Sequence, residues 1–307
     1  MALSISSRSN RDALFGVSFA VLAAVGFSAK AILVKMAYFD RVDAITLLAL
    51  RMVFAAPFFV AAALWARSSH TEPLARRDWL AVLGLGLVGY YLSSFLDFLG
   101  LQYISAGLER LILFLYPTLT VILAALLQRR AIGGKVLVAM ALSYGGILLV
   151  FLHDVGMSRG SVVVGASLVF ASTLSYSVYL VGAGHAIARI GASRFTAYAM
   201  IVACGASLVQ FGATHSLASL DLPVRVYGLA VAMAIFSTVL PVFLLSAGIR
   251  RIGSGHTSLI GSIGPVATIY LAHVFLNESI APQQLMGSML VLAGVVAVGM
   301  QSKSVGK

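Results

Sequence analysis

"GLQYISAGLERLILFLYPTLTVILAAL" (residues 100–126) overlays without a gap on "GIRRIGSGHTSLIGSIGPVATIYLAHV" (residues 248–274), at a constant offset of 148 positions. The overlay aligns glycines, a leucine and a proline: Gly100 with Gly248, Gly107 with Gly255, Leu111 with Leu259, and Pro117 with Pro265. Farther on, Gly146 meets Gly294 at the same offset. Because the offset is nearly half the chain length, it indicates that one folding unit occurs twice.

The composition places this unit in a membrane. Of the 307 residues, 60% are hydrophobic and only 10% are charged, and the mean hydropathy is +1.00. Soluble domains carry about a quarter charged residues, and a helix needs roughly 20 apolar residues to cross the hydrocarbon core. The sequence therefore predicts an all-α membrane protein with ten transmembrane helices, at about residues 13–37, 44–66, 79–100, 104–127, 136–152, 161–182, 194–214, 224–247, 257–275 and 285–301.

The distribution of basic residues predicts the orientation of the chain. With the N-terminus inside, 14 Lys and Arg residues fall in cytoplasmic segments and three, Arg41, Arg159 and Arg225, fall in external ones. This asymmetry is the positive-inside pattern, so we expect both termini to be cytoplasmic. The net charge of +11 is then a consequence of topology and does not indicate a nucleic-acid partner.

Five spans in each copy is an odd number, so the second copy should enter the membrane upside down. We expect a cytoplasmic tail at residues 1–12 and another at 302–307, with an external linker at 153–159. Between them lie two inverted five-helix repeats, at 13–152 and 160–301, around a central cavity. Inverted repeats of this kind support alternating access at a site between the copies.

Pro117 and Pro265 lie within the fourth span of each copy. Proline removes an intrahelical hydrogen bond, so each should kink its helix. Interrupted helices at matching positions of two halves point to a binding site, although prolines in membrane helices also kink for packing alone.

These features resemble the drug/metabolite transporter superfamily, and in particular its EamA-type ten-span members. The resemblance covers the whole chain. It rests on the doubled unit, on "FSAKAILVK" (residues 27–35) followed by Arg51, on the paired prolines, and on "LAHVFLNESIAPQQLMGSMLVLAGVVAV" (residues 271–298) with Glu278 at an acidic position. The first copy departs from the family pattern, since Arg130 stands where a glutamate is common.

The resemblance implies an inner-membrane transporter in which export is favoured over uptake. It also implies that the first, third and fourth spans of each half line the cavity, and that the fifth lies at the periphery.

Six ionisable residues fall inside the predicted spans: Lys30, Lys35, Arg51, Asp97, Glu109 and Arg110. Charge at bilayer depth costs several kcal/mol, so each is a functional candidate. The predicted topology places all six in the outer leaflet. Their counterparts in the second copy are mostly neutral, with Thr257 and Ser258 at the positions of Glu109 and Arg110.

We expect a substrate site formed by Lys30, Tyr91, Phe95, Tyr116, Tyr176 and Tyr179, because ligand sites combine apolar surface with a few polar groups. Asp97, Glu109, Arg110, Arg51 and Lys35 form a candidate coupling or charge network. Asp97 and Glu109 are candidates for proton coupling, since burial raises the pKa of a carboxyl group. Alternatively, Lys35 and Arg51 extend toward the interface or pair structurally, and Arg110 neutralises Asp97 or another carboxylate.

The sequence thus predicts a secondary-active transporter, exporting an amino acid or organic acid by alternating access. A lipid-linked or cationic-drug carrier of the same fold is the alternative. An intramembrane enzyme is remote, because Ser254 and His256 are two positions apart and do not face each other on a helix. We expect no metal, cofactor or nucleic acid. The expected partners are a small-molecule substrate, the lipid bilayer and protons as a candidate coupling ion, with monomer and homodimer both open.

Overall fold

The computed structural model of the chain describes residues 3–68, 74–129, 134–157, 162–261 and 263–302, which are helical except for short connectors. The first half contains α1 (Leu3–Tyr38), α2 (Ala44–Ser68), α3 (Arg76–Gly86), η1 (Leu87–Leu92), α4 (Ser93–Gly100), α5 (Ala106–Leu113), α6 (Tyr116–Gln128) and α7 (Gly134–Met157). The second half contains α8 (Val162–Ile190), α9 (Ala192–Thr214), η2 (Leu217–Leu220), α10 (Val224–Ala234), η3 (Ile235–Val239), α11 (Leu240–Gly261), α12 (Gly264–Leu276) and α13 (Pro282–Ser302).

Each predicted apolar stretch falls mostly on helix in the part of the chain that the structure describes. Among the described residues, seven helical segments are long and apolar enough to cross a membrane, and three further apolar helices are shorter: Met140–Gly156, Gly264–Leu276 and Pro282–Val296. Large apolar side chains such as Trp65 and Leu127 point outward, 77% and 73% exposed. In water such exposure would be costly, whereas the hydrocarbon core accommodates it.

The offset of 148 recurs in the boundaries of the helices. It relates α3 to α10, α6 to α12, and the first residues of α7 and α13. It also relates two short π-helical turns, η1 and η3, which the sequence did not predict. Arg129 and Asn277, at the C-terminal ends of α6 and α12, both adopt left-handed backbone angles, with φ of 51° and 54°. Each half therefore bends and ends its helices at equivalent positions.

One predicted connector is wrong. A break was expected between residues 247 and 257, but α11 continues without interruption to Gly261. In the first half the corresponding region does break, because Ser105 caps a new helix by accepting the N–H of Leu108 at 3.1 Å. The second half has Gly253 at that position, which offers no side chain for such a cap.

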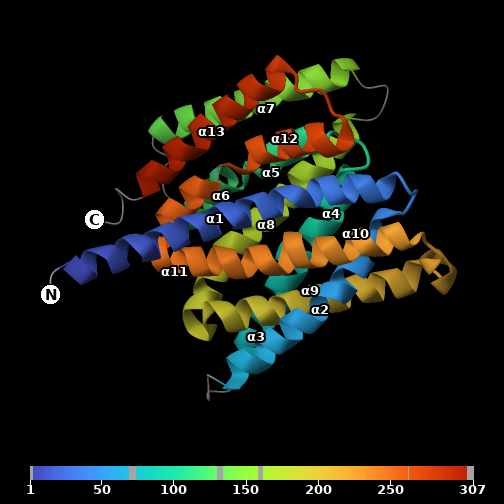
Figure 1. Cartoon of the computed structure of the whole chain (residues 1–307), viewed down its shortest axis with the longest axis horizontal. Coiled ribbons are helices and arrows are strands. Elements are labelled where there is room, and N and C mark those ends of the chain that lie inside the picture. Colours follow the sequence, from blue (N-terminus) through green and yellow to red (C-terminus); the bar gives the residue numbers. More distant parts are fainter. Residues whose placement is uncertain (1–2, 69–73, 130–133, 158–161, 262, 303–307) are drawn as a thin grey trace.

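The helix contacts also come in pairs related by exchange of the two halves. α7 packs on α13, and α2 packs on α9; α1 packs on α11 and α12, as α8 packs on α4 and α6. Figure 1 shows α7 and α13 side by side at one edge of the bundle, and the start of α1 and the end of α13 at the same end. The two copies are thus interleaved into one bundle.

The backbones of α7 and α13 approach each other closely at Gly146. A Cβ on Gly146 would lie 2.5 Å from the carbonyl oxygen of Gly287, whereas a Cβ on Gly145 would meet nothing within 4 Å. Close approach of this kind between membrane helices depends on small residues.

We expect Gly146→Ala to destabilise the protein by about 1–3 kcal/mol, because the two helices must separate. Gly145→Ala, one residue away on the outer face, should change stability by less than about 0.5 kcal/mol. Unfolding of both variants in detergent measures the difference; equal stabilities would contradict the close α7–α13 packing.

Candidate functional site

Lys30 of α1 lies between two carboxylates from neighbouring helices. Its Nζ is 2.5 Å from Oδ2 of Asp97 in α4 and 2.9 Å from Oε1 of Glu109 in α5. The side chains of Lys30, Asp97 and Glu109 are 15%, 3% and 0% exposed. These three residues, the Lys30 cluster, join three helices of the first half by buried charge.

The Lys30 cluster has an excess of acid. Two carboxyl groups face one ammonium group, so ionisation of both would leave one negative charge without a partner, and such a buried charge costs several kcal/mol. Oδ1 of Asp97 and Oε2 of Glu109 are buried without a hydrogen-bond partner, and Oε1 of Glu109 has only its ion pair with Lys30. Arg110 and Arg51 act on these carboxylates only at longer range. At contact distance the cluster is therefore one positive charge short, a deficit that a proton can fill.

Arg110 follows Glu109 on α5 but belongs to no ion pair among the described residues. Its Nε is buried and has no hydrogen-bond partner. The guanidinium group packs over the backbone where α12 begins, since a Cβ on Gly264 would lie 2.7 Å from its Nη2. The N-terminal end of a helix carries partial positive charge, so α12 does not compensate the guanidinium group. The surroundings of Arg110 therefore suit an anion.

Four tyrosines form a continuous series beside this region, which we call the tyrosine ladder. The ring of Tyr116 meets that of Tyr176 edge-on at 5.6 Å, and Tyr176 stacks on Tyr179 at 5.5 Å. The hydroxyl of Tyr179 lies 2.9 Å from that of Tyr90 in η1. Tyr116 lies near Arg110. The ladder thus extends from the neighbourhood of Arg110, across α8, to the π-helical turn of the third span.

Tyr91 and Phe95, the other two predicted site aromatics, lie outside this series. Their rings stack on each other along one helix, with centroids 6.3 Å apart. Phe95 packs against the hydrophobic core formed by α1, α2, α9 and α10. The structure therefore does not bring these two residues together with the tyrosine ladder.

Arg51 and Lys35 have different surroundings from Lys30. Arg51 donates from Nε to Oγ1 of Thr238 at 3.0 Å and lies over the ring of Phe98, 5.4 Å from its centroid. Thr238 belongs to η3, so Arg51 links the second span to the π-helical turn of the other half. Lys35 lies 4.0 Å from the carboxylate of Glu278 and is 23% exposed.

The prolines follow short interruptions of the helices. Pro117 and Pro265 are the second residues of α6 and α12, and the preceding helices end at Leu113 and Gly261. Proline fits the first turn of a helix because that turn needs no N–H donor at this position. Hydroxyls of neighbouring helices donate to nearby carbonyls: Thr173 to Ile112, Ser177 to Tyr116, and Ser28 to Gly264. Such partners allow a membrane helix to break in the protein interior.

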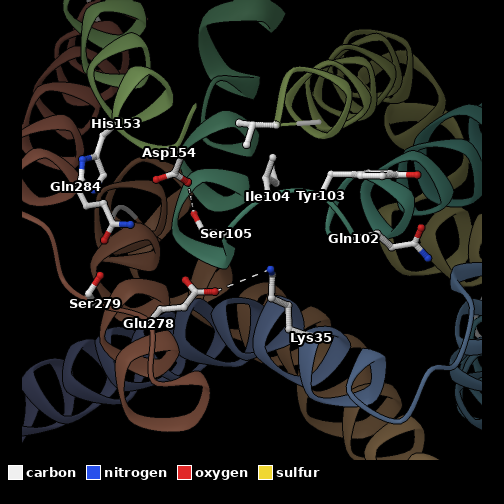
Figure 2. Close-up of a pocket in the computed structure, with 11 residues that line it drawn as sticks. Lys35, Gln102, Tyr103, Ile104, Ser105, His153, Asp154, Glu278, Ser279 and Gln284 are labelled. Atoms are coloured by element: carbon white, nitrogen blue, oxygen red, sulfur yellow. Dashed lines mark hydrogen bonds and ion pairs between the residues drawn. The ribbon is translucent and has the colours of Figure 1, made fainter. Parts of the chain in front are cut away.

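Neither of two pockets among the described residues is lined by the Lys30 cluster. One, of about 320 Å³, is an apolar groove between α12 and α13. The other, of about 330 Å³, lies among the connectors at the end of the bundle away from the termini (Figure 2). We call it the connector pocket. It is lined by Lys35, Gln102, Tyr103, Ile104, Ser105, His153, Asp154, Val162, Glu278, Ser279 and Gln284.

The connector pocket surrounds the start of α5. Asp154 accepts from Oγ of Ser105 at 2.7 Å, and Glu278 accepts from the backbone N–H of Ala106 at 3.3 Å. Burial raises the pKa of the Glu278 carboxyl above its ordinary value, although Lys35 opposes this shift. Sequence reasoning missed Asp154, Ser105 and Gln284, because they lie far apart along the chain, at the end of α7, just before α5 and at the start of α13. Their predicted location on one side of the membrane was the signal that could have grouped them.

Known protein families provide a comparison for this duplicated chain. A model described as the EamA-like transporter family matches residues 14–152 and 163–300. The chain belongs to the EamA-like transporter family. The two matched ranges are related by an offset of about 148 residues, so this EamA-like transporter consists of two copies of the family unit.

Relatives of this protein are also named transporters. A Bacillus subtilis protein named "Uncharacterized transporter YcbK" is 30% identical over 283 residues, which cover 90% of each chain. A Salmonella typhimurium protein named "Uncharacterized inner membrane transporter YicL" is 25% identical over 234 residues, covering 74% of this chain and 75% of that one. A crystal structure with 19% sequence identity superimposes with a TM-score of 0.66, covering 95% and 99% of the two chains, and so shares the fold. The protein is a multi-pass membrane transporter.

The charge balance of the Lys30 cluster predicts that loss of the lysine destabilises the protein far more than loss of one carboxylate does. Lys30→Met leaves two buried carboxylates without a counterion and should destabilise the transporter by about 3–5 kcal/mol. Asp97→Asn leaves one ammonium group opposite one carboxylate, so it should cost less than about 1 kcal/mol and should partly rescue Lys30→Met in the double variant.

Lys35→Met is the matched control, because its ion pair is longer and more exposed, and should cost less than about 1 kcal/mol. Unfolding of the four variants in detergent measures these values. A double variant whose loss equals the sum of the single losses would contradict the charge-balance account.

Proposed function

We propose that this EamA-like transporter is a secondary-active exporter of a small organic metabolite with a carboxylate group, an amino acid or an organic acid. The observation that carries the proposal is Arg110, whose buried guanidinium Nε has no partner beside the tyrosine ladder and the start of α12. An arginine binds a carboxylate with two parallel hydrogen bonds, and Glu109 and Asp97 act on Arg110 only at longer range, which leaves Nε open to a contact.

This proposal assigns the binding of the substrate carboxylate to Arg110 and not, as predicted from the sequence, to Lys30. Lys30 was expected to bind substrate, but Asp97 and Glu109 already occupy its ammonium group at 2.5 and 2.9 Å. We therefore assign the substrate carboxylate to Arg110, and the apolar part of the substrate to Tyr116, Tyr176 and Tyr179. Lys30 then belongs to the coupling network, together with Asp97 and Glu109.

We further propose that the Lys30 cluster exchanges a proton during transport. Its two carboxylates exceed its one ammonium group at contact distance, and α1, α4 and α5 each supply one member. Protonation of one carboxylate would remove the excess charge and release one of the two ion pairs of Lys30. A change in these contacts would shift α1 relative to the break between α5 and α6, which is the kind of two-state element that alternating access requires.

The proposed membrane arrangement has ten spans in two inverted repeats, with both termini in the cytoplasm. It is supported by the odd number of apolar helices in each copy, by the paired helix contacts and by the excess of Lys and Arg on one side. In this arrangement the Lys30 cluster lies toward the outer side, near the end of α1.

The first test identifies the substrate class and the role of Arg110. Purified transporter is screened by thermal stabilisation against amino acids, organic acids, cationic drugs and lipids, and the stabilising compound is used in counterflow from liposomes. Arg110→Gln should weaken carboxylate binding about 10- to 100-fold, since hydrogen bonds to charged groups contribute about 1.5–3 kcal/mol. Arg225→Gln, an exposed external arginine paired with Asp40, is the control and should change nothing.

Gly264→Ala offers a test that keeps the charge of Arg110. The new methyl group would lie 2.7 Å from Nη2, so the guanidinium group must move. We expect about tenfold weaker carboxylate binding, because the geometry of a two-point contact is lost. Gly261→Ala adds a methyl group with no atom within 4 Å and should bind as the wild type does.

In the thermal-stabilisation screen, stabilisation by lipids or cationic drugs alone would favour the alternative carrier function.

Proton coupling is tested with Glu109→Gln. We expect transport by this variant to lose its dependence on pH around neutrality, because the residue that exchanges the proton stays neutral and Lys30 keeps Asp97 as its partner. Counterflow and proton-driven flux are compared over a pH series. An unchanged pH profile would remove Glu109 from the coupling step.

A further inference from the structure

The connector pocket is a second polar region, separate from the Lys30 cluster and from Arg110. Its lining comes from both halves of the chain: the end of α1, the connector before α5, the end of α7, the start of α8, the connector after α12 and the start of α13. Figure 2 shows the carboxylates of Asp154 and Glu278 and the amide end of Gln284 turned toward a common space.

Gln284 places a polar side-chain amide in this pocket, and packing alone does not explain why the residue there is polar. It is only 7% exposed, yet its side-chain amide makes no hydrogen bond to any part of the chain that the structure describes. It lies beside Gly107, where a Cβ would be 3.8 Å from its Nε2. The amide is not enclosed in the protein interior but lines the pocket, so it is open to a ligand there.

The charges around this space favour a cation. Two carboxylates, Asp154 and Glu278, face one ammonium group, that of Lys35, at the loose distance of 4.0 Å from Glu278. His153 also lines the pocket. At the start of α5, Asp154 accepts one hydrogen bond from Ser105, and Glu278 accepts from the backbone N–H groups of Ala106 and Gly107. A carboxylate has about four acceptor positions, so both have positions left. Capping of α5 accounts for the two carboxylates, but it accounts neither for the space nor for the unpartnered amide.

We propose that the connector pocket binds the ammonium group of a small primary amine, with Asp154, Glu278 and the amide oxygen of Gln284 as acceptors. An ammonium group has three donors, which matches this set of three acceptors. The described residues contain no group of three or more His, Cys, Asp or Glu suited to a metal ion. The amine can be part of a zwitterion, whose carboxylate would face Lys35, or it can stand alone. This site goes beyond the proposed function, because it needs neither Arg110 nor the Lys30 cluster.

The test uses three probes of similar size: ethylamine, alanine and propionate. Binding to the purified full-length transporter in detergent is measured by calorimetry at constant ionic strength. We expect ethylamine and alanine to bind and propionate not to compete with ethylamine. Tighter binding of alanine than of ethylamine would identify an amino acid as the source of the ammonium group. Equal binding of propionate at this site, or no binding of ethylamine, would overturn the proposal.

Variants at Gln284 separate binding from stability. Gln284→Met replaces an unpartnered amide with an apolar chain of similar length, so the protein should stay folded while ethylamine binding weakens about tenfold. Gln284→Glu adds a third carboxylate and should tighten ethylamine binding. Gln283→Met, on the exposed face of the same helix, is the control and should bind as the wild type does. No change in either Gln284 variant would contradict its role as an acceptor.

Arg110→Gln distinguishes this site from the proposed substrate site. Ethylamine binding should persist in that variant even where carboxylate transport is lost, because Arg110 does not line the connector pocket. Loss of ethylamine binding in Arg110→Gln would overturn the assignment to the connector pocket. A transporter that exports no carboxylate but still binds ethylamine would refute the proposed function and leave this inference standing.

Discussion

The need to neutralise charge inside a low-dielectric bundle determines the centre of this transporter. Lys30 reaches two carboxylates from different helices, and the three side chains are almost completely removed from the surface. Because an unpaired buried charge is so costly, α1, α4 and α5 must keep these groups together in any conformation that excludes water. The remaining cations are arranged around that requirement. Arg51 donates to Thr238 and lies over the ring of Phe98, whereas Nε of Arg110 has no hydrogen-bond partner.

The duplication supplies the framework in which this charge is held. Both halves bend at equivalent π-helical turns and break their helices just before the equivalent prolines. The halves differ in what surrounds these breaks. The first has a capped short helix, α5, which carries Glu109 and Arg110, whereas the second continues as one long helix with Thr257 and Ser258 at those positions. A symmetric scaffold thus carries an asymmetric set of charges.

The same asymmetry extends to the connector pocket. Glu278 belongs to the second half, but its carboxylate accepts from the start of α5 in the first half. At the equivalent position the first half has Arg130, which could not accept such a bond. The pocket is therefore a product of divergence between the copies. Its polar groups meet the start of α5 at Ala106, and the same helix carries Glu109 and Arg110 three and four residues later.

The sequence by itself determined the class of the protein, its duplicated unit and the positions of its apolar helices. These follow from composition, from span length and from paired glycines and prolines, which act locally along the chain. It also identified Lys30, Asp97 and Glu109 as exceptional, because charge within an apolar segment is visible without a structure.

Only the tertiary structure decided which of these charges meet. Asp97 and Glu109 could each have paired with any of four cations, and distances between helices do not follow from hydropathy. Packing gave both carboxylates to Lys30, left Arg110 beside Gly264 and the tyrosines, and placed Tyr91 and Phe95 outside the tyrosine ladder. The connector pocket was equally inaccessible to sequence, since its residues come from six separate segments that converge only when the two halves pack together.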